Sequence, residues 1–243
     1  MNVVAIIQAR MGSTRLPGKV LMDISGATML SRVVSRVRQA KLLNQIVVAT
    51  SIKSIDDSVA EETERLAVFS FRGSENDVLD RYYQAARLFR AETVVRITSD
   101  CPLIEPKIID EVTNAFLNGD SDYSSNTLVR TYPRGLDVEV FSIAALTKAW
   151  QQANKDYQRV HVTPFLYENP RFFKLQSITN KCNYSKYRWT VDTSEDLELV
   201  RRIYKLLGDN ADFNWLDVID LMKSHPELET INSHIEQKET SKS

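Results

Sequence analysis

Short apolar runs rich in β-branched residues alternate with helical patterns over the first two-thirds of the chain. The runs at residues 3–7, 46–50 and 94–97 are almost continuously apolar, as expected of strands buried on both faces of a sheet. Apolar residues recur at helical spacing between and after these runs, which predicts helices at residues 29–37, 54–66, 77–90 and 106–118. This alternation predicts an α/β fold in which helices flank a mostly parallel central sheet.

The regular alternation of predicted strands and helices ends at about Asp122. Further strands are predicted by the patterns at residues 136–141, 172–178 and 187–191, and helices by those at residues 194–207 and 215–222. We expect one domain over residues 1–225, in which a small β-rich insertion at about 122–180 adds late strands to the same sheet. Residues 226–243 are expected to form a polar tail that frays over its last residues, 237–243.

The charge of the chain limits the classes of partner. Basic and acidic residues are interspersed and the net charge is -1, so the sequence offers no broad basic face for nucleic acid and no polybasic patch for a membrane. An anionic ligand would therefore be bound locally. No apolar stretch has membrane-spanning length, and the two cysteines match no metal-ligand spacing, so we expect a protein of the reducing cytoplasm.

The loop after the first predicted strand, QARMGSTRLPGK at residues 8–19, combines three basic side chains with glycine and serine. It is not a Walker A loop, because five residues separate Gly12 from Gly18 and Val20 follows Lys19. Ligands of open α/β sheets bind at the carboxyl ends of the strands, so Arg10, Arg15 and Lys19 are placed to bind a triphosphate. The alternative is a solvated surface loop with incidental charge.

Two aspartates close apolar runs and are candidate ligands of Mg²⁺, which takes one or two protein carboxylates together with phosphate oxygens. Asp100 ends the run at residues 94–97 after two polar residues, and Asp192 ends the run at 187–191 just before a predicted helix. The alternatives are a turn-forming aspartate at Asp100 and ordinary helix-cap chemistry at Asp192.

Several of these segments carry a family resemblance. Ala9-Arg10, Ser13 and Arg15-Leu-Pro-Gly-Lys19 resemble the A-R-x-x-S-x-R-L-P-G-K signature of the cytidylyltransferases that activate acidic sugars, the acylneuraminate and 3-deoxy-manno-octulosonate enzymes. The match looks closest to the spore coat polysaccharide biosynthesis (SpsF) branch. Two later elements, Asp100-Cys-Pro-Leu-Ile104 and Asp192-Thr-Ser-Glu-Asp-Leu197, also resemble family motifs.

The resemblance implies a Rossmann-like nucleotide-diphospho-sugar transferase fold and a homodimer. It implies transfer of CMP from CTP to an acidic, nonulosonate-type sugar with release of pyrophosphate, for the synthesis of surface polysaccharide. Asp100 and Asp192 would then hold Mg²⁺, with Arg10, Arg15, Lys19 and Asp100 as the catalytic residues. The implied nucleotide-binding residues are Ala9, Arg10, Gly12, Ser13, Arg15, Lys19, Arg72, Ser74, Asn76 and Asp100.

The residues assigned to the base and the acceptor rest on weaker segments. Arg72, Ser74 and Asn76 precede a predicted helix and could equally be helix-cap residues. The acceptor residues implied by similar family elements are Arg134, Asp137, Glu139, Arg159 and His161. Charged residues on an alternating strand usually mark a solvated face, and a lone histidine is more often structural than catalytic.

Three other functions remain open from the sequence. The loop indicates a triphosphate but not a base, so a pyrophosphorylase that uses another nucleotide and a sugar phosphate is an alternative. A glycosyltransferase is a second alternative, although Ser99-Asp100-Cys101-Pro102 lacks the Asp-x-Asp metal pair typical of that class. A third is a nucleotide-binding protein without turnover. The segment 122–180 could also form the dimer arm.

Overall fold

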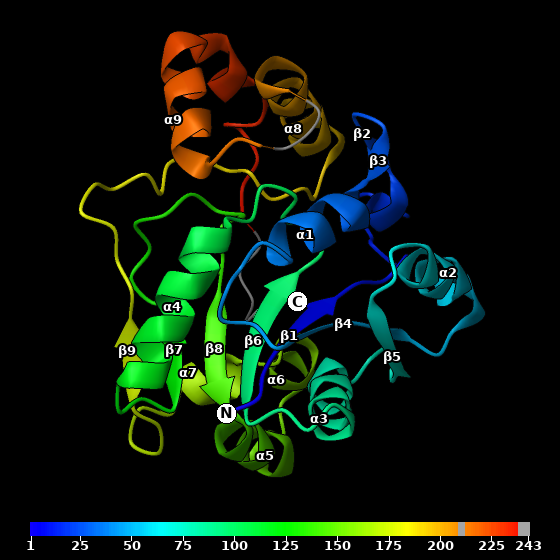
Figure 1. The fold of residues 1–243 in the computed structure, drawn as a ribbon, viewed down its shortest axis with the longest axis vertical. Coiled ribbons are helices and arrows are strands. Elements are labelled where there is room, and N and C mark those ends of the chain that lie inside the picture. The colour runs from blue at the N-terminus through cyan, green and yellow to red at the C-terminus, as the bar shows by residue number, and fades with distance from the viewer. Residues whose placement is uncertain (209–211, 238–243) are drawn as a thin grey trace.

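The centre of the computed structural model, which describes residues 1–208 and 212–237, is a seven-stranded sheet of order β5-β4-β1-β6-β8-β7-β9 (Figure 1). Strands β1, β4, β5 and β6 pair in parallel, and β8 is antiparallel to both β6 and β7. The mostly parallel sheet predicted from the sequence is therefore confirmed. The strands are β1 (Val3–Gln8), β4 (Gln45–Ser51), β5 (Phe69–Gly73), β6 (Thr93–Thr98), β7 (Tyr123–Ser125), β8 (Glu139–Ser142) and β9 (Leu175–Ser177).

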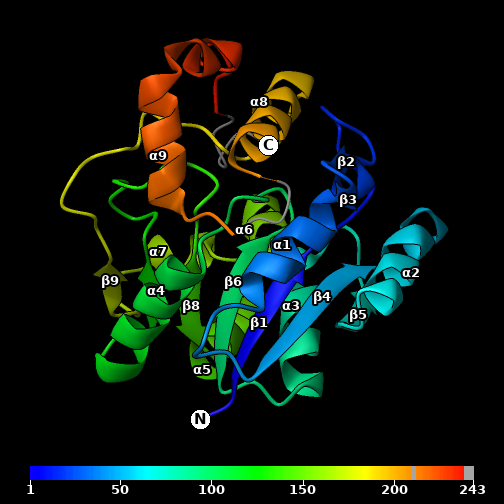
Figure 2. The same cartoon turned by 45° about the horizontal axis from the view of Figure 1, so that its top comes forward.

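Helices cover both faces of this sheet, and each face has its own hydrophobic core (Figure 2). Successive residues of β1 alternate between the two cores: Val3, Ala5 and Ile7 belong to one, Val4 and Ile6 to the other. Burial on both sides explains why this strand is continuously apolar. The helices of the first face are α1 (Met29–Val37), α2 (Asp57–Arg65) and α4 (Pro106–Asn118), and those of the second are α3 (Val78–Leu88), α5 (Ile143–Gln152), α6 (Asp156–His161) and α7 (Pro164–Tyr167).

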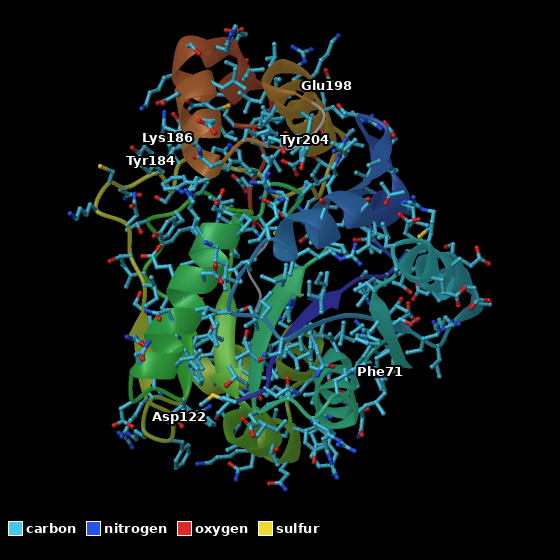
Figure 3. All side chains as sticks on the ribbon, viewed as in Figure 1. Phe71, Asp122, Tyr184, Lys186, Glu198 and Tyr204 are labelled. Carbon is cyan, nitrogen blue, oxygen red and sulfur yellow. The ribbon has the colours of Figure 1, made fainter. Side chains whose placement is uncertain are left out.

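The C-terminal helices pack on the first core beyond the carboxyl ends of the central strands (Figures 1 and 2). Tyr204, labelled in Figure 3, donates a 2.7 Å hydrogen bond to the carbonyl of Pro102, and the Arg32 guanidinium lies 4.7 Å from its ring centroid. These contacts fix the helix over the loop that follows β6. The elements of this region are α8 (Ser194–Leu207), α9 (Trp215–Ser224) and the 3₁₀ helix η3 (Pro226–Ile231).

Two short helices and a hairpin complete the described chain. They are the 3₁₀ helices η1 (Lys19–Leu21) and η2 (Ser54–Asp56) and the two-stranded hairpin of β2 (Asp23–Ile24) and β3 (Ala27–Thr28). No helix within residues 1–208 and 212–237 is long and apolar enough to cross a membrane.

The prediction of a strand at residues 187–191 is wrong. Trp189 and Val191 are fully buried, which produced the apolar signal, but the backbone of this segment pairs with two loops instead of a strand. The amide of Trp189 donates to the carbonyl of Arg134 at 2.7 Å, and that of Val191 donates to the carbonyl of Asp100 at 2.8 Å. The other two late strands are shorter than predicted, since only Glu139–Ser142 and Leu175–Ser177 join the sheet.

The segment 122–180 supplies β7, β8 and β9 to the main sheet and the helices α5, α6 and α7. Late strands do complete the same sheet, as the sequence predicts, but helices occupy much of the segment. Its role as a dimer arm stays a prediction. Within the predicted tail, Leu228 and Asn232 are buried. Fraying is predicted for residues 237–243, of which all but Gln237 lie outside the described residues.

Candidate active site

A cavity of about 440 Å³ opens at the carboxyl ends of β1 and β6. Six basic side chains and three acidic ones line it within the described chain, so the cavity is positive although the whole chain has a net charge of -1. Such an excess of fixed positive charge favours an anionic ligand. The basic residues are Arg10, Arg15, Lys19, Arg81, Arg96 and Arg134, and the acidic residues are Asp100, Asp137 and Asp192.

The loop after β1 is fixed through Met11. The amide of Met11 donates to Asp56 Oδ1 at 2.6 Å, and its carbonyl accepts hydrogen bonds from the amides of Ser13 at 2.8 Å and Gly18 at 3.0 Å. Gly18 has φ +72°, a left-handed conformation that favours glycine, and it starts the 3₁₀ helix that carries Lys19. A fixed loop of this kind holds its side chains ready for a ligand.

Several backbone amides of the loop remain available to a ligand. Those of Gly12, Thr14 and Arg15 donate no hydrogen bond to any group within residues 1–208 and 212–237. Backbone amides in tight loops bind anions well, because they supply partial positive charge in a fixed geometry. The loop therefore offers a triphosphate both amides and cations.

Lys19 joins the two candidate metal ligands. Its Nζ lies 3.0 Å from Oδ2 of Asp100, 2.9 Å from Oδ1 of Asp192 and 2.7 Å from the carbonyl of Val191. Burial opposes the charged form of the ammonium, but the two carboxylates outweigh burial and raise the pKa of Lys19 above its ordinary value. Lys19 is thus held as a cation at the centre of the site.

Asp192 is held by a buried network of charges. Its Oδ2 accepts a hydrogen bond from Arg188 and forms an ion pair with Arg15, each at 2.8 Å. Arg188 also pairs with Asp196, which is fully buried and accepts hydrogen bonds from the amide of Asp192 and from Asn232. The network fixes the orientation of the Asp192 carboxylate.

Asp100 is the more open of the two carboxylates, with a quarter of its side chain exposed. Burial opposes ionisation of this group, but Lys19 and the hydrogen bond from Thr98 lower the pKa of Asp100 below its ordinary value. Its backbone carbonyl accepts the amide of Val191 at 2.8 Å, so the loop after β6 is joined directly to the segment that carries Asp192.

This pair fits a divalent cation. Two carboxylates that share one ammonium at 3.0 and 2.9 Å are close enough to share one metal ion, and hard oxygen donors are the ligands that Mg²⁺ prefers. Within the described residues no group of three or more acidic, histidine or cysteine side chains could hold a metal, so phosphate oxygens and water would have to complete the coordination.

All the residues that line the cavity, except Gln237, lie in the part of the chain that matches a known enzyme family. The sequence profile described as cytidylyltransferase matches residues 4–214. The chain belongs to the cytidylyltransferase family. Members of this family are nucleotidyltransferases, so the chain is an enzyme of that class, as the sequence predicted.

Similar proteins agree with this assignment. The chain is 33% identical over 236 residues to the spore coat polysaccharide biosynthesis protein SpsF of Bacillus subtilis (strain 168), an alignment that covers 94% of the chain and 97% of SpsF. It is 42% identical over 111 residues to a 3-deoxy-manno-octulosonate cytidylyltransferase of Geobacter sulfurreducens, covering 46% of the chain and 44% of that enzyme. The chain is also 36% identical to a cytidylyltransferase of known structure from Leptospira borgpetersenii serovar Hardjo-bovis. The two structures superpose with a TM-score of 0.91, and the alignment covers 98% of the chain and 100% of that protein. The predicted family and nucleotidyltransferase fold are therefore confirmed.

The cavity brings together most of the cytidylyltransferase residues predicted from the sequence. They come from five separate parts of the chain, namely the loop after β1, the loop after β6, the segment before β8, the end of α6 and the segment before α8. The predicted residues that line the cavity are Ala9, Arg10, Gly12, Ser13, Arg15, Lys19, Asp100, Arg134, Asp137, His161 and Asp192.

Three predicted nucleotide contacts do not line the cavity. Arg72 donates to the carbonyls of Ser51 and Lys53 and pairs with Asp57. Ser74 accepts the amide of Asp77 at the start of α3, and Asn76 is exposed. The helix-cap alternative therefore describes the observed contact of Ser74 in this structure.

Two predicted acceptor residues also lie outside the cavity wall. The buried Glu139 pairs with Arg96 and accepts the Tyr123 hydroxyl at 2.6 Å. Arg159 forms a two-armed pair with Asp77 and so ties α6 to the start of α3. In this structure both residues support neighbours of the cavity.

His161 reaches the cavity from an unusual turn at the end of α6. The amide of Thr163 donates to the carbonyl of His161 at 2.9 Å around Val162, which has φ +73° and ψ −59°. This is a γ-turn of the rare, strained kind, here at a buried β-branched residue. Burial, Arg96 and Arg10 lower the pKa of His161 below its ordinary value, so the imidazole is neutral at pH 7.

Several residues of the cavity wall were not predicted from the sequence. Arg96 carried a signal, since it is the one charge in an otherwise apolar strand. Arg81 stands in the helical segment after Asn76 and resembles any helix surface arginine until the structure shows it buried. Gln237 carried none, because only the packing of the C-terminal segment brings it to the cavity, where it accepts Arg188 Nη1 at 2.6 Å.

Proposed function

We propose that the chain transfers CMP from CTP to an acidic sugar of the nonulosonate or octulosonate type, with Mg²⁺, and releases pyrophosphate. One observation carries this proposal: Lys19 holds Asp100 and Asp192 together at the centre of a cavity rich in basic groups. The cytidylyltransferase family and the names of the relatives support CTP as the nucleotide.

In this reaction an oxygen of the acceptor sugar forms a bond to the α-phosphorus, while the bond from that phosphorus to the bridging oxygen of the β-phosphate breaks. Arg10, Arg15 and the amides of the loop after β1 bind the triphosphate and offset the charge that builds on the leaving pyrophosphate. Lys19, fixed between two carboxylates, places its ammonium beside the reacting phosphate with little freedom to lose on binding.

Asp100 and Asp192 are the residues that would hold Mg²⁺, which would neutralise charge on the α-phosphate and polarise the phosphoryl group. Asp100 has the greater capacity for this role, because Asp192 already accepts hydrogen bonds from Lys19 and Arg188 and pairs with Arg15. The chain's own contribution is to keep both carboxylates ionised and oriented.

The acceptor would bind against Arg134, Asp137 and His161. Arg134 is half-buried and forms no salt bridge with any described residue, so its guanidinium can bind a carboxylate of the sugar in a two-armed geometry. Asp137 is held by Arg130 at 2.6 Å and can accept a sugar hydroxyl. The name of the Bacillus relative supports a surface polysaccharide as the destination of the product. A homodimer through the segment 122–180 is part of the same proposal.

The test is release of pyrophosphate from CTP, UTP, GTP and ATP, each with and without Mg²⁺, over a panel of acidic sugars and sugar phosphates. We expect turnover only with CTP, Mg²⁺ and a sugar that bears a carboxylate. Turnover with another nucleotide and a sugar phosphate would instead establish a pyrophosphorylase. Binding without pyrophosphate release on any acceptor, combined with transfer from a nucleotide sugar, would establish a glycosyltransferase.

A further inference from the structure

Arg81 is a buried cation in the cavity wall, and it has no role in the reaction described above. Only 1% of the residue is exposed. Its Nη1 donates to the carbonyl of Ser74 at 2.7 Å, while its Nε is buried and has no hydrogen-bond partner within residues 1–208 and 212–237. A buried guanidinium with an unused donor is costly unless a ligand completes its hydrogen bonds.

The nearby carboxylates Asp56 and Glu75 offset the charge of Arg81 only in part. It forms no salt bridge with any residue that the structure describes, and the nearby carboxylates are engaged elsewhere. Asp56 accepts the amide of Met11 and the hydroxyl of Ser51, and Glu75 pairs with Lys53. Burial, together with the like charge of Arg10, lowers the pKa of Arg81 below its ordinary value.

Arg10, which is half-buried, resembles Arg81 in its lack of a direct partner. It lines the cavity and forms no salt bridge with a described residue. Its loop lies against the segment before α3, since a Cβ added at Gly12 would lie 3.3 Å from Oε1 of Glu75. Two guanidiniums on one wall, neither with a salt-bridge partner among the described residues, therefore favour a ligand that carries several negative charges.

We propose that Arg81 and Arg10 together bind the β- and γ-phosphates of the nucleotide, the group that leaves as pyrophosphate. The inference rests on the proposed function for the identity of the nucleotide. Lys19, which is surrounded by Asp100 and Asp192, then serves the α-phosphate, and the two cationic groups divide the triphosphate between them. Gly73 leaves room for Arg81, because a Cβ there would lie 2.9 Å from Cε1 of Phe71 and 3.1 Å from Cγ of Arg81.

The test is calorimetric binding of CMP, CTP and inorganic pyrophosphate to the wild type, Arg81→Met and Arg87→Met. Arg87 is the matched control, since it is an exposed arginine of the same helix outside the cavity. We expect Arg81→Met to weaken CTP and pyrophosphate by about tenfold or more, as loss of charged hydrogen bonds predicts, and CMP by less than about twofold. Arg87→Met should bind all three as the wild type does.

Equal losses for CMP and CTP would overturn the proposal, because Arg81 would then serve the base, the ribose or the loop. Unchanged binding of all three would overturn it as well. If Arg81→Met does not fold, Arg81→Lys is compared with the wild type in the same way. We then expect a smaller loss of affinity for CTP and pyrophosphate, with the affinity for CMP unchanged. A wild type that binds pyrophosphate but not CTP would contradict the proposed function and leave the anion site standing.

Discussion

Nζ of Lys19 lies 2.9 Å from Oδ1 of Asp192, although 173 residues separate them along the chain. The first residue follows the loop after β1 and the second precedes α8, so the contact forms only when the C-terminal helices pack over the sheet. The site is therefore complete only when the segment before α8 lies against the residues that follow β1 and β6.

Removing this cation should nearly abolish turnover. We expect Lys19→Met to lower kcat by two orders of magnitude or more, because loss of one partner that stabilises transition-state charge typically costs about 10²–10³. The measurement is pyrophosphate release at saturating CTP. Lys205→Met, which removes an exposed lysine of α8, is the control and should keep wild-type kcat. Wild-type turnover in Lys19→Met would remove Lys19 from the mechanism.

Asp100 should set the metal dependence. Asp100→Asn keeps the shape of the side chain and removes the charge, so we expect the Mg²⁺ concentration at half-maximal rate to rise about tenfold or more. Asp220→Asn changes an exposed aspartate of α9 in the same way and should leave the metal dependence unchanged. An identical Mg²⁺ titration for Asp100→Asn and the wild type would dismiss the metal assignment.

The sequence predicted the half of the site that is local. Arg10, Arg15 and Lys19 follow one strand in one short loop, and strand-end placement was enough to bring them to the rim of the sheet together with Asp100. It could not predict that residues 187–191 would pair with loops, because an apolar alternating run has the same pattern whether or not a strand lies beside it. Nor could it place Gln237, whose position depends on how the C-terminal segment packs.

The buried Asp196 should make stability depend on pH. Burial opposes its ionisation, but hydrogen bonds from Arg188, Asn232 and the amide of Asp192 lower the pKa of Asp196 below its ordinary value of 3.8. A carboxyl whose pKa is lower in the folded state stabilises the fold above its unfolded pKa, and this stabilisation is lost as the pH falls through the folded pKa.

We therefore expect the free energy of unfolding to fall below about pH 4, and to fall less steeply in Asp196→Asn than in the wild type. Asp196→Ala should destabilise the fold by about 3–5 kcal/mol at pH 7, because it leaves the buried Arg188 short of a partner. Urea unfolding across this pH range measures both effects. Glu198→Ala, which removes an exposed carboxylate of the same helix, is the control. Parallel pH curves for the wild type and Asp196→Asn would contradict the assignment.

Gly135 should tolerate no side chain, because the loop at Arg134 packs directly on the segment before Asp192. It has φ +102°, and an added Cβ would lie 2.6 Å from the backbone nitrogen of Thr190. Gly26 supplies the matched control, since its φ is +82° but an added Cβ would meet nothing within 4 Å. Gly26→Ala thus carries conformational strain alone, at about 1 kcal/mol, whereas Gly135→Ala adds a clash with main chain that cannot yield without moving Trp189 and Thr190. We expect Gly135→Ala to lower the free energy of unfolding by about 3 kcal/mol or more and to lower kcat as well, because the displaced segment carries Asp192. Equal losses of stability in the two variants would show that the close approach at Gly135 contributes nothing.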